Sequence, residues 1–73
     1  MSATTGLGEE LRRHLTLHQR QLMQYQEIER RDFPPETGEG DDRLQHAILR
    51  AGIAMETFWI EWLTQTVRDL PDP

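Results

Sequence analysis

The sequence predicts an all-α fold: an antiparallel two-helix hairpin that dimerises into a four-helix, coiled-coil-like bundle. Three observations predict it. Two long segments carry apolar residues at helical spacing, a connector with prolines and glycines separates them, and no stretch alternates apolar and polar residues as a strand would. Two helices joined by a connector of about nine residues pack most simply as antiparallel neighbours.

The second helix is predicted over residues 41–70 and carries most of the apolar residues. One set alternates at spacings of four and three, which places its members on one helix face. This first set comprises Leu44, Ile48, Ala51, Met55, Phe58 and Trp62. A second set lies off that line and comprises Leu49, Ile53, Ile60, Leu63 and Val67. Together they cover roughly 260° of the helix, whereas a surface helix needs an apolar stripe of only about 100°.

The first helix is predicted over residues 9–31 and has a much narrower apolar line. Glu9 and Glu10 are expected in its first turn, where carboxylates favour the positive end of the helix dipole. Its predicted inner face consists of Leu11, Leu15, His18, Leu22 and Tyr25. Phe33 precedes two prolines, which ends the helix because a residue before proline is disfavoured in the α conformation.

Three further segments complete the predicted organisation: a flexible lead-in at residues 1–8, the connector at 32–40 and a tail at 71–73.

A narrow first helix cannot cover the wide apolar arc of the second. The remainder would be a large exposed patch, which monomeric proteins rarely carry. A chain of 73 residues buries a marginal core, and without cysteine it has neither disulfides nor thiolate metal sites to supplement it. We therefore expect a homodimer whose interface includes both apolar lines. Small residues in the second helix would let the backbone of a partner helix approach closely. These residues are Ala47, Ala51, Gly52 and Ala54.

Composition argues against several functions. The net charge of −5 makes direct nucleic-acid binding by this chain unexpected, and no apolar run approaches the roughly 18 residues of a membrane span. The absence of cysteine fits a cytoplasmic protein. No arrangement of catalytic side chains is recognisable, so neither enzymatic activity nor a cofactor is expected.

A histidine pair and an aromatic cluster each allow a ligand-binding interpretation beside a purely structural one. His14 and His18 have the i,i+4 spacing that can hold zinc, but no Glu follows His14; a bundle hydrogen bond for His18 and a solvated His14 are favoured. The cluster of Met55, Trp59 and Trp62, next to Phe58, is most simply core packing. It is also the candidate binding site for a flat aromatic ligand. Because Glu56 and Glu61 flank the cluster, a positively charged ligand is expected.

Two segments resemble a known family. Residues 14–29 (HLTLHQRQLMQYQEIE) and 43–63 (RLQHAILRAGIAMETFWIEWL) resemble the C-terminal domain of PadR-like transcriptional regulators, the type also described as virulence activator alpha C-terminal. The matching residues are His14, His18, Leu22, Tyr25, Ile28 and Glu29, then Leu49-Arg50-Ala51-Gly52-Ile53, Glu56, Trp59 and Glu61-Trp62-Leu63.

The resemblance implies a role in transcription. In that family an N-terminal winged helix binds DNA and the C-terminal helices form the homodimer, and some members sense small aromatic or drug-like molecules. The winged helix is missing from this sequence. The chain is thus expected to be a homodimerisation and effector-sensing domain. The alternative is a stand-alone helical adaptor or decoy that pairs with another protein, and the genomic context upstream would discriminate the two.

Overall fold

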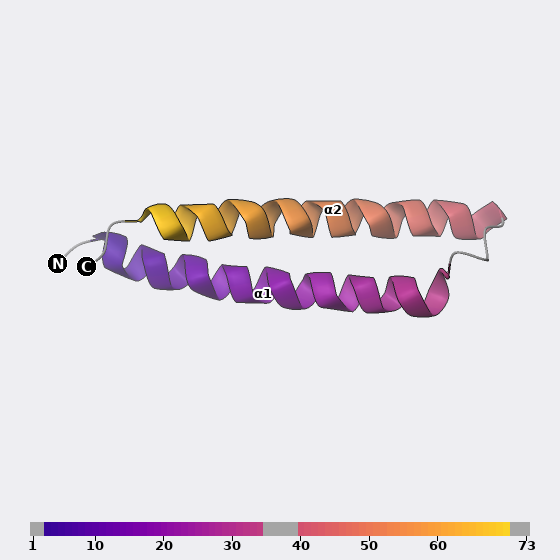
Figure 1. Ribbon diagram of the computed structural model, residues 1–73, viewed down its shortest axis with the longest axis horizontal. Helices are drawn as coiled ribbons and strands as arrows, with labels where there is room; N and C mark the ends of the chain where they lie inside the picture. The colour runs from indigo at the N-terminus through magenta and orange to yellow at the C-terminus, as the bar shows by residue number, and fades with distance from the viewer. Residues whose placement is uncertain (1–2, 35–39, 71–73) are drawn as a thin grey trace.

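Two long helices lie side by side in the computed structural model, which describes residues 3–34 and 40–70 (Figure 1). Helix α1 spans Ala3–Asp32 and helix α2 spans Gly40–Asp69, each 30 residues. They run antiparallel, so the start of α1 and the end of α2 meet at one end of a rod of 56 × 15 × 14 Å. The described residues form no strand. The predicted all-helical, two-helix fold is therefore confirmed.

The helix ends differ slightly from those expected. α1 begins at Ala3 and not at Glu9, so the described part of the predicted lead-in is helical and no acidic residue lies in the first turn. At the other end, the Phe33 N–H still donates to the Glu29 carbonyl at 2.9 Å. The next residue is Pro34, which has no N–H to continue the helix. The rest of the predicted connector, residues 35–39, and the tail at 71–73 lie outside the described residues.

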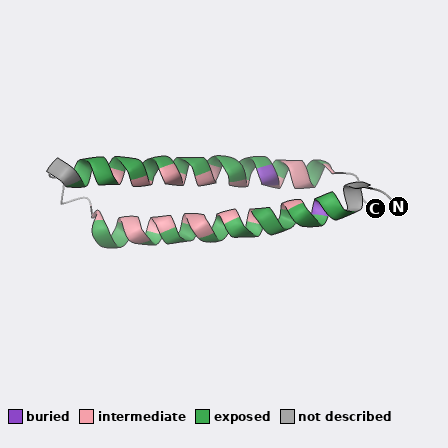
Figure 2. Cartoon of the chain, turned by 180° about the vertical axis from the view of Figure 1, so that it is seen from behind, coloured by how far each residue is buried: buried purple, intermediate pink, exposed green. Residues whose placement is uncertain are grey.

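The residues of intermediate burial lie mainly on the facing sides of the two helices (Figure 2). The facing side of α1 contains the five residues predicted for its inner face, which are Leu11, Leu15, His18, Leu22 and Tyr25. The facing side of α2 contains the second apolar set, Leu49, Ile53, Ile60, Leu63 and Val67. Leu63 is only 2 % exposed and is the one apolar side chain among the described residues that is fully buried. The hairpin alone therefore has a very small core.

The first apolar set of α2 lies on the other side of the helix. We call this set the outer stripe: Leu44, Ile48, Ala51, Met55, Phe58 and Trp62, all exposed. At 100° per residue the two sets point well over 90° apart, so a single neighbouring helix can cover only one of them. Within the hairpin, α2 therefore contacts α1 through the second apolar set, and the outer stripe is left uncovered.

A glycine lets one aromatic side chain lie against the α2 backbone. A Cβ built on Gly52 would come within 3.1 Å of Cε2 of Tyr25. That distance is too short for ordinary van der Waals contact, so a larger residue at position 52 would displace the tyrosine ring. A glycine inside a helix costs up to about 1 kcal/mol relative to alanine. Close packing of Tyr25 explains its presence in the middle of α2.

No helix in the described part of the chain is both long enough and apolar enough to cross a membrane.

Candidate dimerisation surface

The outer stripe presents large apolar side chains to solvent along most of α2. Its five bulky members expose between 47 % and 67 % of their surface, with Trp62 the least and Leu44 the most exposed. From Leu44 to Trp62 the stripe runs for about 27 Å at 1.5 Å per residue. A contiguous exposed apolar strip of this kind is the usual mark of an interaction site.

Three aromatic rings form the wider end of this surface. The rings of Trp59 and Trp62 meet edge to face, with centroids 5.9 Å apart and planes at 87°. Phe58 and Trp59 meet in the same manner at 5.6 Å and 70°. Such pairs contribute about 0.5–1.5 kcal/mol beyond area burial. The contacts hold the rings together but leave their outer faces exposed, so the cluster is not core within one chain.

Acidic side chains stand beside these rings. A shallow groove of about 480 Å³ is lined by Phe58, Glu61, Trp62, Gln65, Thr66 and Asp69. Of the two acids that the sequence predicts near the cluster, only Glu61 lines the groove, and Asp69 joins it from about two turns further along the helix. Aromatic faces next to carboxylates favour a cationic ligand.

Glu56 has a different role because it points toward α1. Its Oε2 lies 2.5 Å from Nδ1 of His18, and its side chain is only 13 % exposed. The imidazole of His18 also stacks on the indole of Trp59, with centroids 5.7 Å apart and planes at 10°. We call the hydrogen-bonded pair of His18 and Glu56 the 18–56 bridge. It joins the helices by a polar contact that neighbours the aromatic cluster.

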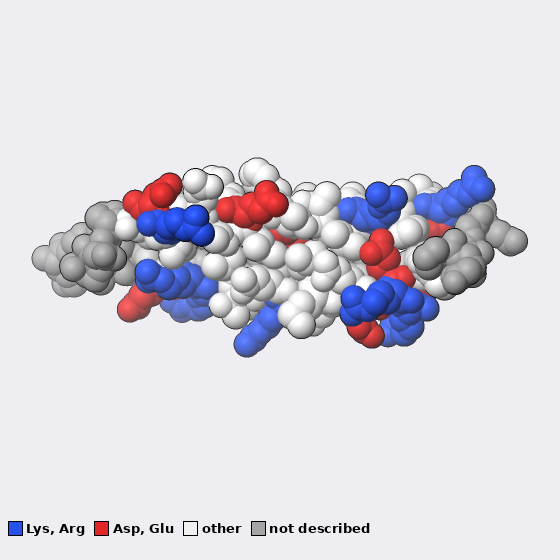
Figure 3. Space-filling model, viewed as in Figure 1, with Lys and Arg blue, Asp and Glu red and all other residues white. Residues whose placement is uncertain are grey.

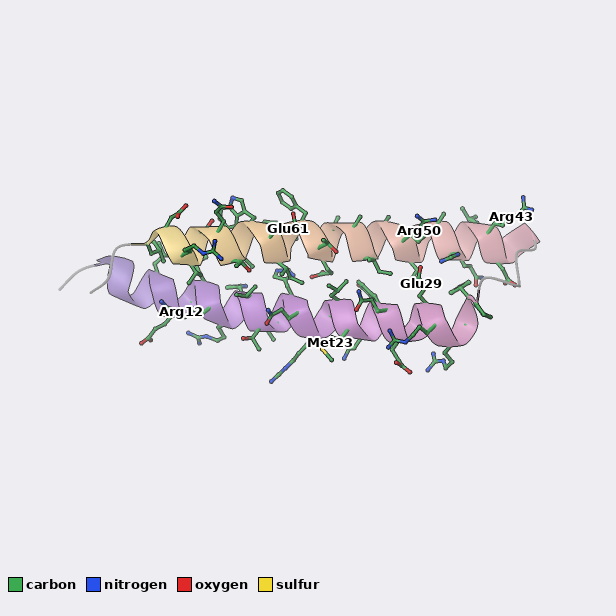
Figure 4. All side chains as sticks on the ribbon, viewed as in Figure 1. Arg12, Met23, Glu29, Arg43, Arg50 and Glu61 are labelled. Carbon is green, nitrogen blue, oxygen red and sulfur yellow. The ribbon has the colours of Figure 1, made fainter. Side chains whose placement is uncertain are left out.

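A matching pair lies nearer the connector. Nε2 of His46 lies 2.8 Å from Oε2 of Glu29, and the His46 ring stacks on Phe33 at 5.0 Å and 8°. Figure 4 shows Glu29 pointing from α1 toward α2. In this 46–29 bridge the histidine comes from α2, the acid comes from α1 and the aromatic ring is that of Phe33, the residue directly after α1. The 18–56 bridge has the reverse arrangement, with the histidine on α1 and the acid and the ring on α2. A slip of one helix along the other would break both, so the two bridges fix the register of the hairpin.

The histidines do not converge on a metal site. His14 pairs with Glu10 on its own helix at 3.2 Å, while His18 and His46 each bond a glutamate across the hairpin. Among the residues that the structure describes, no three His, Asp or Glu side chains are grouped to hold an ion. The i,i+4 histidines of the sequence are thus each engaged by a carboxylate.

Figure 3 shows charged side chains of both signs distributed along the visible face of the rod, with uncharged surface between them. Several form exposed pairs within α1, such as Arg13 with Glu10 at 2.9 Å and Arg30 with Glu27 at 2.6 Å. Hydrogen bonds from Arg31 lower the pKa of the adjacent Asp32. Exposed pairs contribute at most about 1 kcal/mol each, so the charges influence association more than folding.

The two bridges were not predicted as pairs from the sequence. The sequence alone predicts Glu56 beside the aromatic cluster and indicates no partner for His46. A signal was present: Glu56 falls between Ile53 and Ile60, on the face of α2 that the second apolar set forms. An acid on a buried face needs a hydrogen-bond partner, and His18 lies on the inner line of the other helix.

A comparison with known protein families gives a match along most of the chain. The family model of the virulence activator alpha C-terminal domain matches residues 2–70. The chain belongs to this family. The match covers nearly the whole sequence and confirms the resemblance found in its two helical segments. A search of curated proteins and a search of solved structures find no match. The family relates the chain to a domain of virulence and transcription activators.

The 18–56 bridge gives a stability prediction. Replacing Glu56 by Ala should lower the free energy of unfolding by about 1–3 kcal/mol, because it removes the partner of a half-buried imidazole. Glu27→Ala is the matched control, since Glu27 pairs with Arg30 in solvent, and it should change stability by no more than about 0.5 kcal/mol. Urea unfolding followed by circular dichroism measures both. Equal effects would show that the bridge contributes no more than a surface pair.

Proposed function

We propose that the chain is the homodimerisation domain of a PadR-like transcriptional regulator, and that the outer stripe of one copy packs against that of a second copy. The exposed stripe on α2 is the observation that carries this proposal. A four-helix bundle of two hairpins would bury it, and family membership supports a role in the assembly of a regulator.

The surface area of the hairpin supports a second copy as the occupant. A folded monomer of 8.6 kDa exposes about 4,700 Å², whereas this chain exposes 5981 Å². The excess of accessible surface indicates that a single hairpin exposes surface that a globular protein of the same mass would bury. Two copies that covered each other's stripes would remove on the order of 1,000 Å², which reaches the size of a specific interface.

Charge placement favours an antiparallel arrangement about a twofold axis. Arg43 and Glu61 are 18 residues apart, five full helical turns, so they lie on the same side of α2 (Figure 4). Arg43 is near the start of the helix, and Glu61 is about two turns before its end. Neither has an ion-pair partner among the described residues. Antiparallel pairing of two α2 helices centred on Gly52 brings Arg43 of each copy beside the opposite charge of the other. A self-complementary patch of this kind is what a twofold dimer requires.

The dimer has a direct test. Sedimentation of the chain at micromolar concentration should give twice the mass of 8.6 kDa. Ala51→Glu should dissociate the dimer, because it buries an unpaired carboxylate in the middle of the stripe. Gln19→Glu adds the same charge at an exposed position of α1 and should leave the mass unchanged. A wild-type chain that sediments as a compact, helical monomer would contradict dimerisation and favour the alternative of an adaptor for another protein.

We further propose that the aromatic end of the stripe takes a cationic, planar aromatic effector. Trp59 and Trp62 offer indole faces, and Met55 can adapt its shape. The groove beside them carries Asp69, whose carboxylate stays available to a cation when Glu61 pairs with Arg43 of the second copy. In the antiparallel pairing centred on Gly52, the last turn of each α2 extends beyond the first turn of the other. The part of the groove that Gln65, Thr66 and Asp69 form would therefore remain open within the dimer.

Tryptophan fluorescence tests this effector role. A cationic planar dye should quench the emission saturably at micromolar concentration, and Trp62→Ala should abolish saturable quenching while the protein stays dimeric. Leu17→Ala removes an exposed apolar side chain from α1 and should leave quenching intact. Quenching that rises linearly with dye concentration, or a Trp62→Ala chain that unfolds, would show that the cluster serves packing alone.

A further inference from the structure

The 18–56 bridge touches the outer stripe through one residue, Trp59. This indole lies at the edge of the stripe and is 39 % exposed, less than any bulky member of the stripe itself. The imidazole of His18 stacks on this indole, with ring centroids 5.7 Å apart. It also meets Phe58 and Trp62, which belong to the stripe, in edge-to-face pairs. Trp59 therefore links the interior of the hairpin to the surface proposed for dimerisation.

His18 is itself held in place from the other helix. Its side chain is 27 % exposed, and the hydrogen bond from the ring to Glu56 fixes the orientation of the imidazole plane. Glu56 and Trp59 lie three residues apart on α2, so the ring of His18 fits between a carboxylate and an indole of one helix face. This arrangement leaves Trp59 few alternative rotamers without losing the stack.

Orientation of Trp59 matters for association. Tryptophan is the residue type most enriched among those that dominate binding energy at protein interfaces. Ordering a mobile side chain on binding opposes association, whereas a side chain already held in its bound orientation does not incur that loss. We infer that His18 is a positioning residue for the dimer: by stacking on Trp59 it sets the aromatic end of the stripe in the orientation that a second copy binds. The inference rests on the proposed dimerisation.

The 46–29 bridge provides an internal control. It has the same chemistry, a histidine hydrogen-bonded to a glutamate and stacked on an aromatic ring. The ring is Phe33 at the end of α1, and helical spacing puts His46 on the side of α2 away from the stripe. Loss of either bridge should reduce stability, but only loss of the His18 stack should weaken association.

The experiment compares a ring with an aliphatic side chain at position 18. All variants carry Glu56→Gln, and the His46→Leu variant also carries Glu29→Gln, so that no carboxylate is left unpaired between the helices. In this background His18→Leu removes the ring, His18→Phe retains one that can stack on Trp59, and His46→Leu disrupts the control bridge. Sedimentation equilibrium gives the dimer dissociation constant of each, and circular dichroism establishes that each is helical.

We expect His18→Leu to raise the dissociation constant by about three- to tenfold relative to Glu56→Gln alone. His18→Phe and His46→Leu should remain within about twofold. Equal constants for the Leu and Phe variants at position 18, or an equal rise for His46→Leu, would overturn the positioning role. Should His18→Leu not fold, a His18→Phe constant within twofold supports the role and a tenfold rise overturns it. A Glu56→Gln parent and a wild-type chain that are both monomeric would instead overturn the dimer itself.

Discussion

Burial of α2 is the constraint on which the rest of this structure depends. The helix carries two apolar faces, and α1 covers only the one that contains Leu63. Within a hairpin no other element exists to cover the second face, so the outer stripe is exposed along its length. In the proposed dimer, stability and assembly would be coupled, because the chain's own core consists of one line of side chains and further burial would come from the second copy.

Polar contacts determine how the two helices fit together. An apolar line alone would allow the helices to slide by a turn with little change in burial. The histidine–glutamate bridges at positions 18–56 and 46–29 oppose such a slip, because each needs one particular residue on each helix. The closely packed pair of Tyr25 and Gly52 lies between them and adds a steric constraint at the middle of the rod. Register specificity is the best-attested use of polar groups in helical interfaces.

Spacing in the sequence was sufficient to predict the two helices, the hairpin and the inner line of α1, because only one face of α1 is apolar. It could not decide which face of α2 would meet α1. Both faces are apolar and regularly spaced, and the choice depends on details such as the room that Gly52 leaves for Tyr25 and the partner that Glu56 requires. The early start of α1 also escaped prediction, since its first turns contain small and polar residues that are weak indicators of helix.

Distances between spin labels would test the antiparallel pairing of the outer stripes most directly, and the lack of cysteine makes site-specific labelling simple. Arg50→Cys and Arg68→Cys are suitable sites, since both are exposed and lie on one side of α2, five turns apart. In an antiparallel dimer centred on Gly52 the two labels at position 50 are offset along the helix by about 6 Å, and those at position 68 by about 48 Å. A short distance for the first pair and a long one for the second is the predicted result. Equal distances at both positions, or no dipolar coupling at all, would contradict it.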